Sequence, residues 1–301
     1  MRSLRVILIY LAFVFLGGAL VAPWLWFLVQ WLAEATPTLE PLSRQPFSRY
    51  VSRCFLVLAL AGLWPFLRAL GIKSWAGVGL SRAPGRWRWL AIGFAAGFLS
   101  LALVAGLNLA VGARQLNLDH TAAVVLGNFL AAALAAVVVA VLEELLFRGA
   151  LFGTLRRDNP LAVAVLASSG LYALLHFFQR PAPPAEVNWL TGLALLPEML
   201  RGFVDAQQLV PGFFNLTLAG AILAMAFHRT GSLFLSIGLH AGWIFWLKSY
   251  GFLTRDVPGA TVGFWGTGKL IDGWLALVAL AVVSAVVWRA TVPAKNSAST
   301  P

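Results

Sequence analysis

Apolar stretches about as long as a bilayer is thick recur along the chain, and they constrain its fold more than any other feature. A transmembrane helix needs ~20 consecutive, mostly apolar residues. Of the 301 residues, 60% are hydrophobic and 11% are charged, whereas a soluble domain has roughly 25% charged residues. The sequence therefore predicts an all-α, polytopic transmembrane helix bundle of about eight spans. The expected spans are 6–33, 54–70, 89–111, 122–155, 159–178, 209–227, 232–247 and 273–292.

The spans divide the chain into four segments. Residues 1–120 hold the N-terminal transmembrane helices, residues 121–250 a helical core, and residues 251–292 a loop with the last transmembrane helix. The polar tail 293–301 is expected to be disordered. The first apolar run is longer than the roughly 7–15 residues of a secretory signal, which predicts a retained anchor. The single cysteine, Cys54, excludes an internal disulfide and a multi-cysteine metal site.

The net charge of +11 fits a membrane surface better than nucleic acid. The Lys and Arg side chains lie mostly in the loops between spans, where they set orientation and contact anionic lipid. If the N-terminus is cytoplasmic, the cytoplasmic segments carry slightly more Lys and Arg than the segments on the other side of the membrane. We therefore expect a multi-pass protein, in the plasma membrane, with both termini in the cytoplasm and lipid as its constant partner. We expect no binding to nucleic acid.

Few ionisable groups lie inside the expected spans, and such groups are costly there. An ionised side chain near the bilayer centre costs about 2.5–3.5 kcal/mol or more, so a chain keeps it only where it has a use. Sparse groups of this kind usually converge on one site. The five groups are Glu143, Glu144, Arg148, His176 and His240.

The helical spacing of these groups gives the two acids different surroundings. Glu144 and Arg148 are four residues apart, so on an α-helix they share a face and can pair. Glu143 is rotated by about 100° and has Phe147, not a cation, four residues on. One carboxylate is thus neutralised by its own helix, and the other is free to act as a general base.

Counting residues from the neighbouring loops places the two histidines near this acid. At 1.5 Å per residue, Glu143 lies roughly 20 Å and His176 roughly 24 Å from the loop 156–160 that they share. His240 lies roughly 14 Å from the loop 228–231, one to two turns shallower, within the reach of a tilted helix. The three side chains are therefore expected to line one cavity.

Two chemical roles fit this set, and the spacing does not choose between them. Glu143 with His176 can polarise a water that attacks a peptide carbonyl, while His240 donates to the developing oxyanion. Alternatively, Glu143, His176 and His240 can hold a catalytic zinc ion with one open position. The HExxH signature of many zinc hydrolases is absent. We favour the first role, which requires no cofactor.

Three segments that carry these residues resemble the motifs of the CAAX prenyl protease and bacteriocin-processing (CPBP) family of intramembrane endopeptidases. The first is similar to the family's EExxxR motif, and the second to its FxxxH motif with Tyr172 in place of Phe. The segments are 143–149 (EELLFRG), 168–176 (SSGLYALLH) and 229–243 (RTGSLFLSIGLHAGW). The resemblance covers about residues 120–247. It implies that residues 121–250 form the catalytic core of an endopeptidase that cleaves a membrane-associated protein or peptide, of glutamate type or metallo type.

The resemblance also implies roles for the individual residues. Glu143 would activate water with His176, and His240 would help to form the oxyanion hole. Glu144 and Arg148 would support the site.

One position departs from the family's pattern. Its last motif usually reads HxxxN, but the fourth residue after His240 is Ile244, so an expected oxyanion donor is missing. The candidates to replace this donor are Trp243, Asn215 and Asn128. The departure leaves open a slow enzyme, an altered substrate range or a member that has lost catalysis.

Two other functions compete with the protease. In a proton-coupled carrier, Glu143 and the histidines would relay protons, a common use of buried acids. Against this function, the sequence shows neither visible repeats nor Gly/Pro-broken spans in matching halves, which many carriers have. In a catalytically inactive scaffold or immunity-type protein of the same fold, the site would only bind a membrane peptide, and Ile244 favours this alternative.

Overall fold

The chain is predominantly helical, as the apolar stretches predict. We describe residues 2–81, 84–179, 181–204 and 206–291 of a computed structural model. Each of the eight expected spans corresponds to a helix, which confirms the all-α fold. Within the described ranges, five helices are long and apolar enough to cross a membrane, and two further apolar helices are shorter. The chain is an integral membrane protein. The predicted tail 293–301 lies outside the described residues.

The helices cluster into two compact units, of which the first is formed by Met1–Lys73 and Phe177–Asp205. In this unit, α1 packs against both α3 and α8. The segment 189–200 contains the short helix α8, with Pro197 inside it. The elements are α1 (Arg2–Ala35), η1 (Pro37–Leu39), α2 (Glu40–Ser43), α3 (Phe47–Ala69), α8 (Thr191–Met199) and η4 (Leu200–Phe203).

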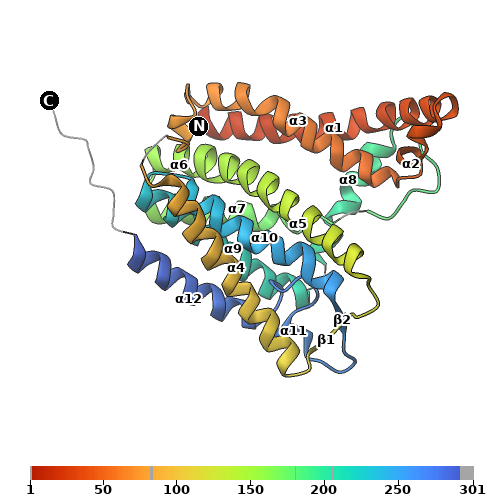
Figure 1. Cartoon of the computed structure of the whole chain (residues 1–301). Helices are drawn as coiled ribbons and strands as arrows, with labels where there is room; N and C mark the ends of the chain where they lie inside the picture. Colours follow the sequence, from red (N-terminus) through yellow and green to blue (C-terminus); the bar gives the residue numbers. More distant parts are fainter. Residues whose placement is uncertain (1, 82–83, 180, 205, 292–301) are drawn as a thin grey trace. The chain divides into compact units, whose positions relative to one another are not determined.

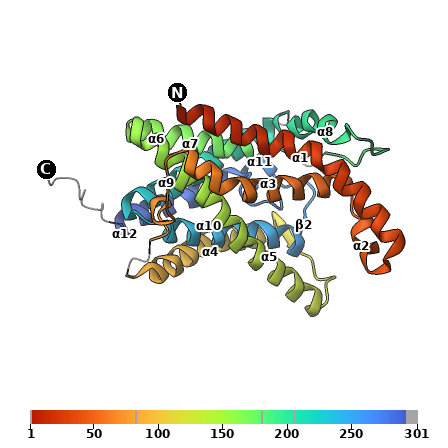
Figure 2. The same ribbon diagram turned by 90° about the horizontal axis from the view of Figure 1, so that it is seen from above.

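The second unit is formed by Ser74–His176 and Ala206–Pro301 and contains all five predicted site residues. Helix α10 lies in its interior, with α4, α5 and α9 around it (Figures 1 and 2). The elements are η2 (Ala76–Val78), α4 (Arg86–Ala110), β1 (Arg114–Leu116), α5 (Ala122–Glu143), η3 (Glu144–Phe152), α6 (Gly153–Asp158), α7 (Leu161–Leu175), α9 (Ala206–Thr230), α10 (Phe234–Leu253), β2 (Thr254–Asp256), α11 (Val262–Trp265) and α12 (Trp274–Ala290).

Glycines bring the backbones of α4 and α10 into direct contact. Each helix carries a Gly-x-x-x-Gly sequence, Gly93 to Gly97 in α4 and Gly238 to Gly242 in α10. A Cβ atom at Gly97 would lie 2.2 Å from the carbonyl oxygen of Leu239, so no side chain fits there. Small residues at this spacing are typical of close helix packing in membranes. We call the four positions the glycine seam.

The glycine seam also orients His240. This residue follows Gly238 by two positions and precedes Gly242 by two, so it is rotated about 200° from each around α10. The face of α10 that is pressed against α4 therefore lies opposite the face that carries the histidine. His240 points to the side on which α10 packs against other helices, and its ring is buried.

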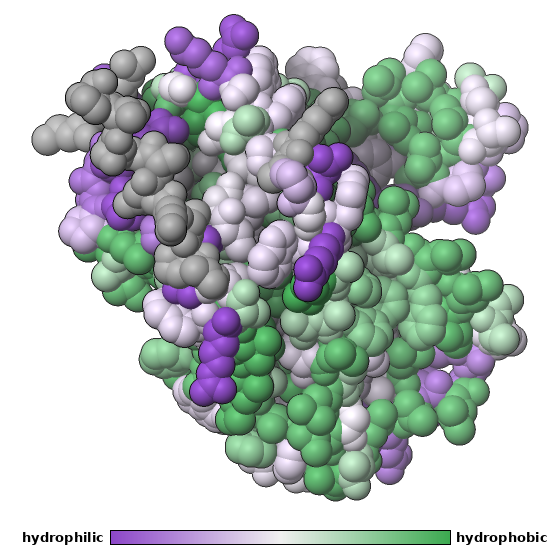
Figure 3. All heavy atoms as spheres, turned by 60° about the vertical axis from the view of Figure 1, so that its left-hand side comes forward, coloured by the Kyte–Doolittle hydropathy of each residue, from purple (hydrophilic) through white to green (hydrophobic). Residues whose placement is uncertain are grey.

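Large apolar side chains cover the outward faces of several helices. On α5, Leu126, Leu130 and Leu134 are all exposed, and their four-residue spacing places them on one face. Val278, Val282 and Val286 form a similar stripe on α12. The face in Figure 3 shows wide hydrophobic areas with hydrophilic residues gathered in separate groups. Such surfaces suit contact with lipid tails.

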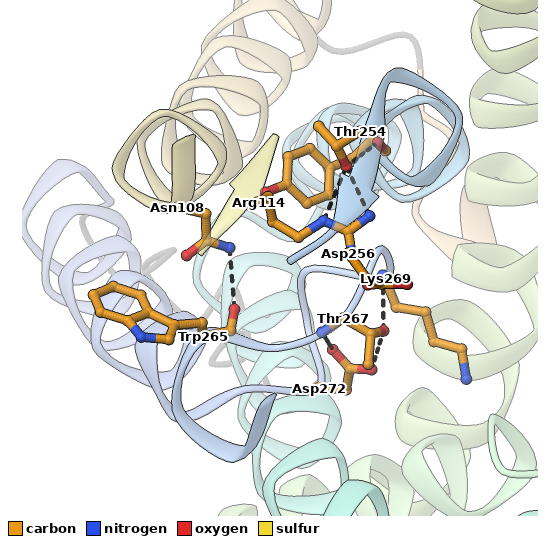
Figure 4. Close-up of polar contacts among 9 residues, drawn as sticks. Asn108, Arg114, Thr254, Asp256, Trp265, Thr267, Lys269 and Asp272 are labelled. Carbon is orange, nitrogen blue, oxygen red and sulfur yellow. Dashed lines mark hydrogen bonds and ion pairs between the residues drawn. The ribbon is translucent and has the colours of Figure 1, made fainter. Parts of the chain in front are cut away.

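A two-stranded antiparallel ribbon, which the sequence did not predict, joins β1 to β2 next to the ends of α4 and α10. The buried Arg114 side chain donates to Thr254 Oγ1 from Nε at 3.1 Å and from Nη2 at 2.9 Å, and it pairs with Asp256. Nearby, the side chain of Asp272 accepts from Thr267, and Asn108 donates to a carbonyl oxygen (Figure 4). These contacts satisfy polar groups at one end of the second unit.

The glycine seam predicts a specific loss of stability. Gly97→Ala should destabilise the protein by about 1–3 kcal/mol, because its Cβ would overlap the backbone of α10. The matched control is Gly106→Ala in the same helix, where a Cβ meets nothing within 4 Å. The control should be neutral or stabilising, since Ala favours a helix over Gly. Thermal unfolding in detergent measures both, and equal melting temperatures would refute the packing.

Candidate active site

The acidic pair lies at the junction between an α-helix and a π-helix. The sequence predicts one α-helix over 122–155, but α5 ends at Glu143 and a π-helix, η3, runs from Glu144 to Phe152 before α6 begins. This is a correction to the expected continuous α-helix. A π-helix is less stable than an α-helix, and short π segments occur frequently at functional sites. Next to the site, Gly149 allows close contact with η2, since a Cβ there would lie 2.9 Å from that of Val78.

The carboxylate of Glu144 is shared between two partners. Its Oε1 accepts a hydrogen bond from Arg148 Nη1 at 2.8 Å, the pair that the four-residue spacing predicts. The same oxygen is 2.9 Å from His240 Nδ1 on α10. The side chains of all three residues are 4% exposed or less. The second contact was not anticipated, because it depends on how two helices pack.

Glu143 faces both histidines at the same distance. Its Oε2 lies 3.7 Å from Nε2 of His176 and 3.7 Å from Nε2 of His240. That oxygen is buried and accepts no hydrogen bond from the described residues. A separation of 3.7 Å is too long for a direct hydrogen bond, but one water can contact both atoms of such a pair. The three residues that were expected to line one cavity are therefore close together.

The other ring nitrogens are held by groups that can only accept. His176 Nδ1 is 2.8 Å from the backbone carbonyl oxygen of Tyr172, and His240 Nδ1 is bound to the carboxylate of Glu144. A carbonyl or an ionised carboxylate has no proton to donate, so each Nδ1 carries the hydrogen. In its neutral form, each ring therefore turns an Nε2 lone pair toward Glu143.

The hydroxyl group of Tyr172 completes the polar lining, and sequence reasoning gave it no role. Its Oη lies 3.2 Å from His240 Nε2, and the residue is 3% exposed. When His240 is neutral, its Nε2 is an acceptor, and the tyrosine hydroxyl is then the donor in this contact. The signal in the sequence was the Tyr at the position where the FxxxH motif has Phe.

The candidates for the missing oxyanion donor are engaged or distant. Trp243 Nε1 donates to Ser100 Oγ at 3.0 Å, and Asn215 Nδ2 donates to two backbone carbonyl oxygens at 2.8 Å. Asn128 precedes Glu143 by 15 positions on α5, which is roughly 22 Å along a helix. Ile244, which replaces the family's Asn, is buried. None of these residues supplies the expected donor.

The choice between a bound water and a zinc ion stays a prediction. Among the described side chains, no group of three or more His, Cys, Asp and Glu is placed so that it could hold a metal ion. The ring nitrogen of His240 that faces Glu143 is also in contact with Tyr172. Glu143, His176 and His240 are the residues that would hold zinc in the alternative role.

Comparison with known proteins supports the motif-based resemblance. Residues 125–246 match a family model described as Type II CAAX prenyl endopeptidase Rce1-like. The matched segment runs from α5 into α10 and contains the acidic pair, the arginine and both histidines. The predicted resemblance is confirmed over this segment. No curated protein and no solved structure matches the chain.

The buried pair predicts a large effect of removing its cation. Arg148→Met leaves Glu144 without its guanidinium in a site closed to water, which should cost about 3–5 kcal/mol and lower the melting temperature markedly. The matched control is Arg44→Met, which breaks an exposed i,i+4 pair with Glu40 whose side chains are 74% and 55% exposed. That change should cost less than about 1 kcal/mol. Similar melting temperatures for the two variants would contradict the assigned burial.

Proposed function

We propose that this protein is an intramembrane endopeptidase that hydrolyses a peptide bond of a membrane-associated protein or peptide. The observation that carries the proposal is the equal 3.7 Å approach of Glu143 Oε2 to two imidazole nitrogens within a segment that matches Rce1-like proteins. Because the matched family is described as prenyl endopeptidases, a peptide with a prenylated cysteine near its C-terminus is the first substrate to test.

In the proposed reaction, Glu143 and His176 hold the nucleophilic water. The water donates one hydrogen to the carboxylate Oε2 of Glu143 and the other to Nε2 of His176, since both atoms are acceptors. A lone pair of the water oxygen then faces the substrate. The oxygen attacks the carbonyl carbon, and Glu143 takes the released proton. The carbonyl oxygen becomes the oxyanion of a tetrahedral intermediate, which we place on the side of His240.

Collapse of the intermediate completes the hydrolysis. The C–N bond breaks, and the proton held by Glu143 passes to the leaving amine, so the products are a carboxylic acid and an amine. Glu143 returns to its ionised form and can bind the next water. Glu144 and Arg148 do not contact the reacting atoms in this scheme. They fix the orientation of His240 through its Nδ1.

Replacing the proposed base tests the mechanism directly. Glu143→Gln keeps the shape of the side chain but removes its ability to take a proton, so kcat should fall by at least ~10²–10⁴-fold. Cleavage of a farnesylated peptide in detergent micelles, followed by mass spectrometry, measures the loss. Melting temperature serves as the control for folding. Cleavage by the variant at the wild-type rate would show that another residue is the base.

The proposed mechanism predicts indifference to chelators. Activity of the purified protein should be unchanged after incubation with excess 1,10-phenanthroline and dialysis, since in this mechanism Glu143 and His176 hold the water without a metal ion. The same assay compares the farnesylated peptide with its unmodified form and so reports whether the prenyl group is needed. Loss of activity that added zinc restores would instead favour the zinc site at Glu143, His176 and His240.

A further inference from the structure

The hydroxyl group of Tyr172 is a neutral donor on the side of the site where the oxyanion is placed. It is 3.2 Å from His240 Nε2, which in turn is 3.7 Å from Glu143 Oε2. With Nδ1 of His240 bound to Glu144, the neutral ring has no hydrogen on its inner nitrogen. Neutral His240 is thus unable to donate to an oxyanion, whereas the tyrosine O–H can.

We infer that Tyr172 supplies the hydrogen bond to the oxyanion. In the family's motif an Asn would supply this bond, but Ile244 stands at that position here. This inference rests on the proposed endopeptidase function and adds a catalytic residue to it. Before the reaction, the O–H donates to His240 Nε2 and is held in the site. As the oxyanion forms, rotation about the Cζ–Oη bond turns the hydrogen toward it, without movement of the ring.

The ring of Tyr172 is fixed by contacts that do not involve its hydroxyl. The Arg148 guanidinium lies 4.4 Å from the ring centroid, and Phe147 packs edge-on with a centroid distance of 5.1 Å. The backbone carbonyl of the same residue binds His176 Nδ1 at 2.8 Å. Loss of the hydroxyl alone therefore leaves the packing and the orientation of His176 in place. Tyr172→Phe therefore removes the hydroxyl and its contact with His240 but keeps the ring contacts.

The burial of Tyr172 also suits a preorganised oxyanion donor. An oxyanion donor acts best when it is already in position and shielded from water before the charge develops. Tyr172 is 3% exposed, whereas the side chains of Glu143 and His176, which must admit water, are 23% and 31% exposed. The tyrosine is thus more shielded than the side chains of Glu143 and His176.

The test compares kcat and KM of the wild type and Tyr172→Phe with the farnesylated peptide. We expect kcat to fall by ~10²–10³-fold, as for loss of one oxyanion donor, with KM changed less than about twofold, because the bond forms only as charge develops. The matched control is Tyr250→Phe, another buried tyrosine in the second unit, which should behave as the wild type. Adding Ile244→Asn to Tyr172→Phe should restore part of kcat by returning the family's donor.

The outcomes separate this role from the proposed function. If the wild type and Tyr250→Phe cleave the peptide and Tyr172→Phe has an unchanged kcat, or a defect in KM alone, the role of Tyr172 is wrong and the endopeptidase stands. If the wild type cleaves neither the farnesylated nor the unmodified peptide, the endopeptidase and the oxyanion donor are overturned together. An unchanged melting temperature of Tyr172→Phe verifies that a fall in kcat is not a loss of folded protein.

Discussion

The structure of the site depends on how one buried carboxylate, that of Glu144, is neutralised. An ion within apolar surroundings is stable only when its charge and its hydrogen-bonding capacity are matched by close partners. Glu144 takes one partner from its own π-helix, Arg148, and the other from α10, His240. The first partner neutralises the charge, and the second links two elements far apart in the sequence. Because Glu144 uses both, Glu143 keeps its carboxylate free.

The glycine seam sets the other limit on the position of α10. Apolar side chains gain little by leaving lipid for protein, so helices in a membrane associate through close fit and polar contacts. The seam provides the close fit on one face of α10, and the contact of His240 with Glu144 provides the polar link on the opposite side. An imidazole fixed from both directions keeps its Nε2 in one place. Such rigidity is what a site for water activation requires.

The sequence predicted the helices and the proximity of the five buried ionisable groups, because both predictions depend on local patterns. Apolar length identifies spans, and the cost of burying charge singles out the acids, Arg148 and the two histidines. Depth counted along straight α-helices placed His240 too shallow, although its Nε2 lies 3.7 Å from Glu143. The count ignores helix tilt and the π-helix. A π-helix differs from an α-helix in its backbone hydrogen bonding. No residue type in 144–152 indicates this difference.

The features that the sequence missed all depend on tertiary contacts. Which nitrogen of His240 carries hydrogen follows from Glu144 approaching Nδ1, and the donor role that we propose for the Tyr172 hydroxyl rests on that assignment. The glycine seam is visible as two spaced glycine pairs, but their partnership requires knowing that α4 and α10 are neighbours. The β-ribbon involves segments only three residues long, too short to give an alternating pattern.

The uneven exposure of the site has a consequence for the order of events in turnover. The side chains of Glu143 and His176 are partly exposed, while Glu144, Arg148 and His240 are sealed. In the mechanism that we propose, water and peptide would then both reach the site from the side of Glu143 and His176. A bound peptide would hinder the entry of solvent from that side, so the proposed cycle would begin with a water already in place.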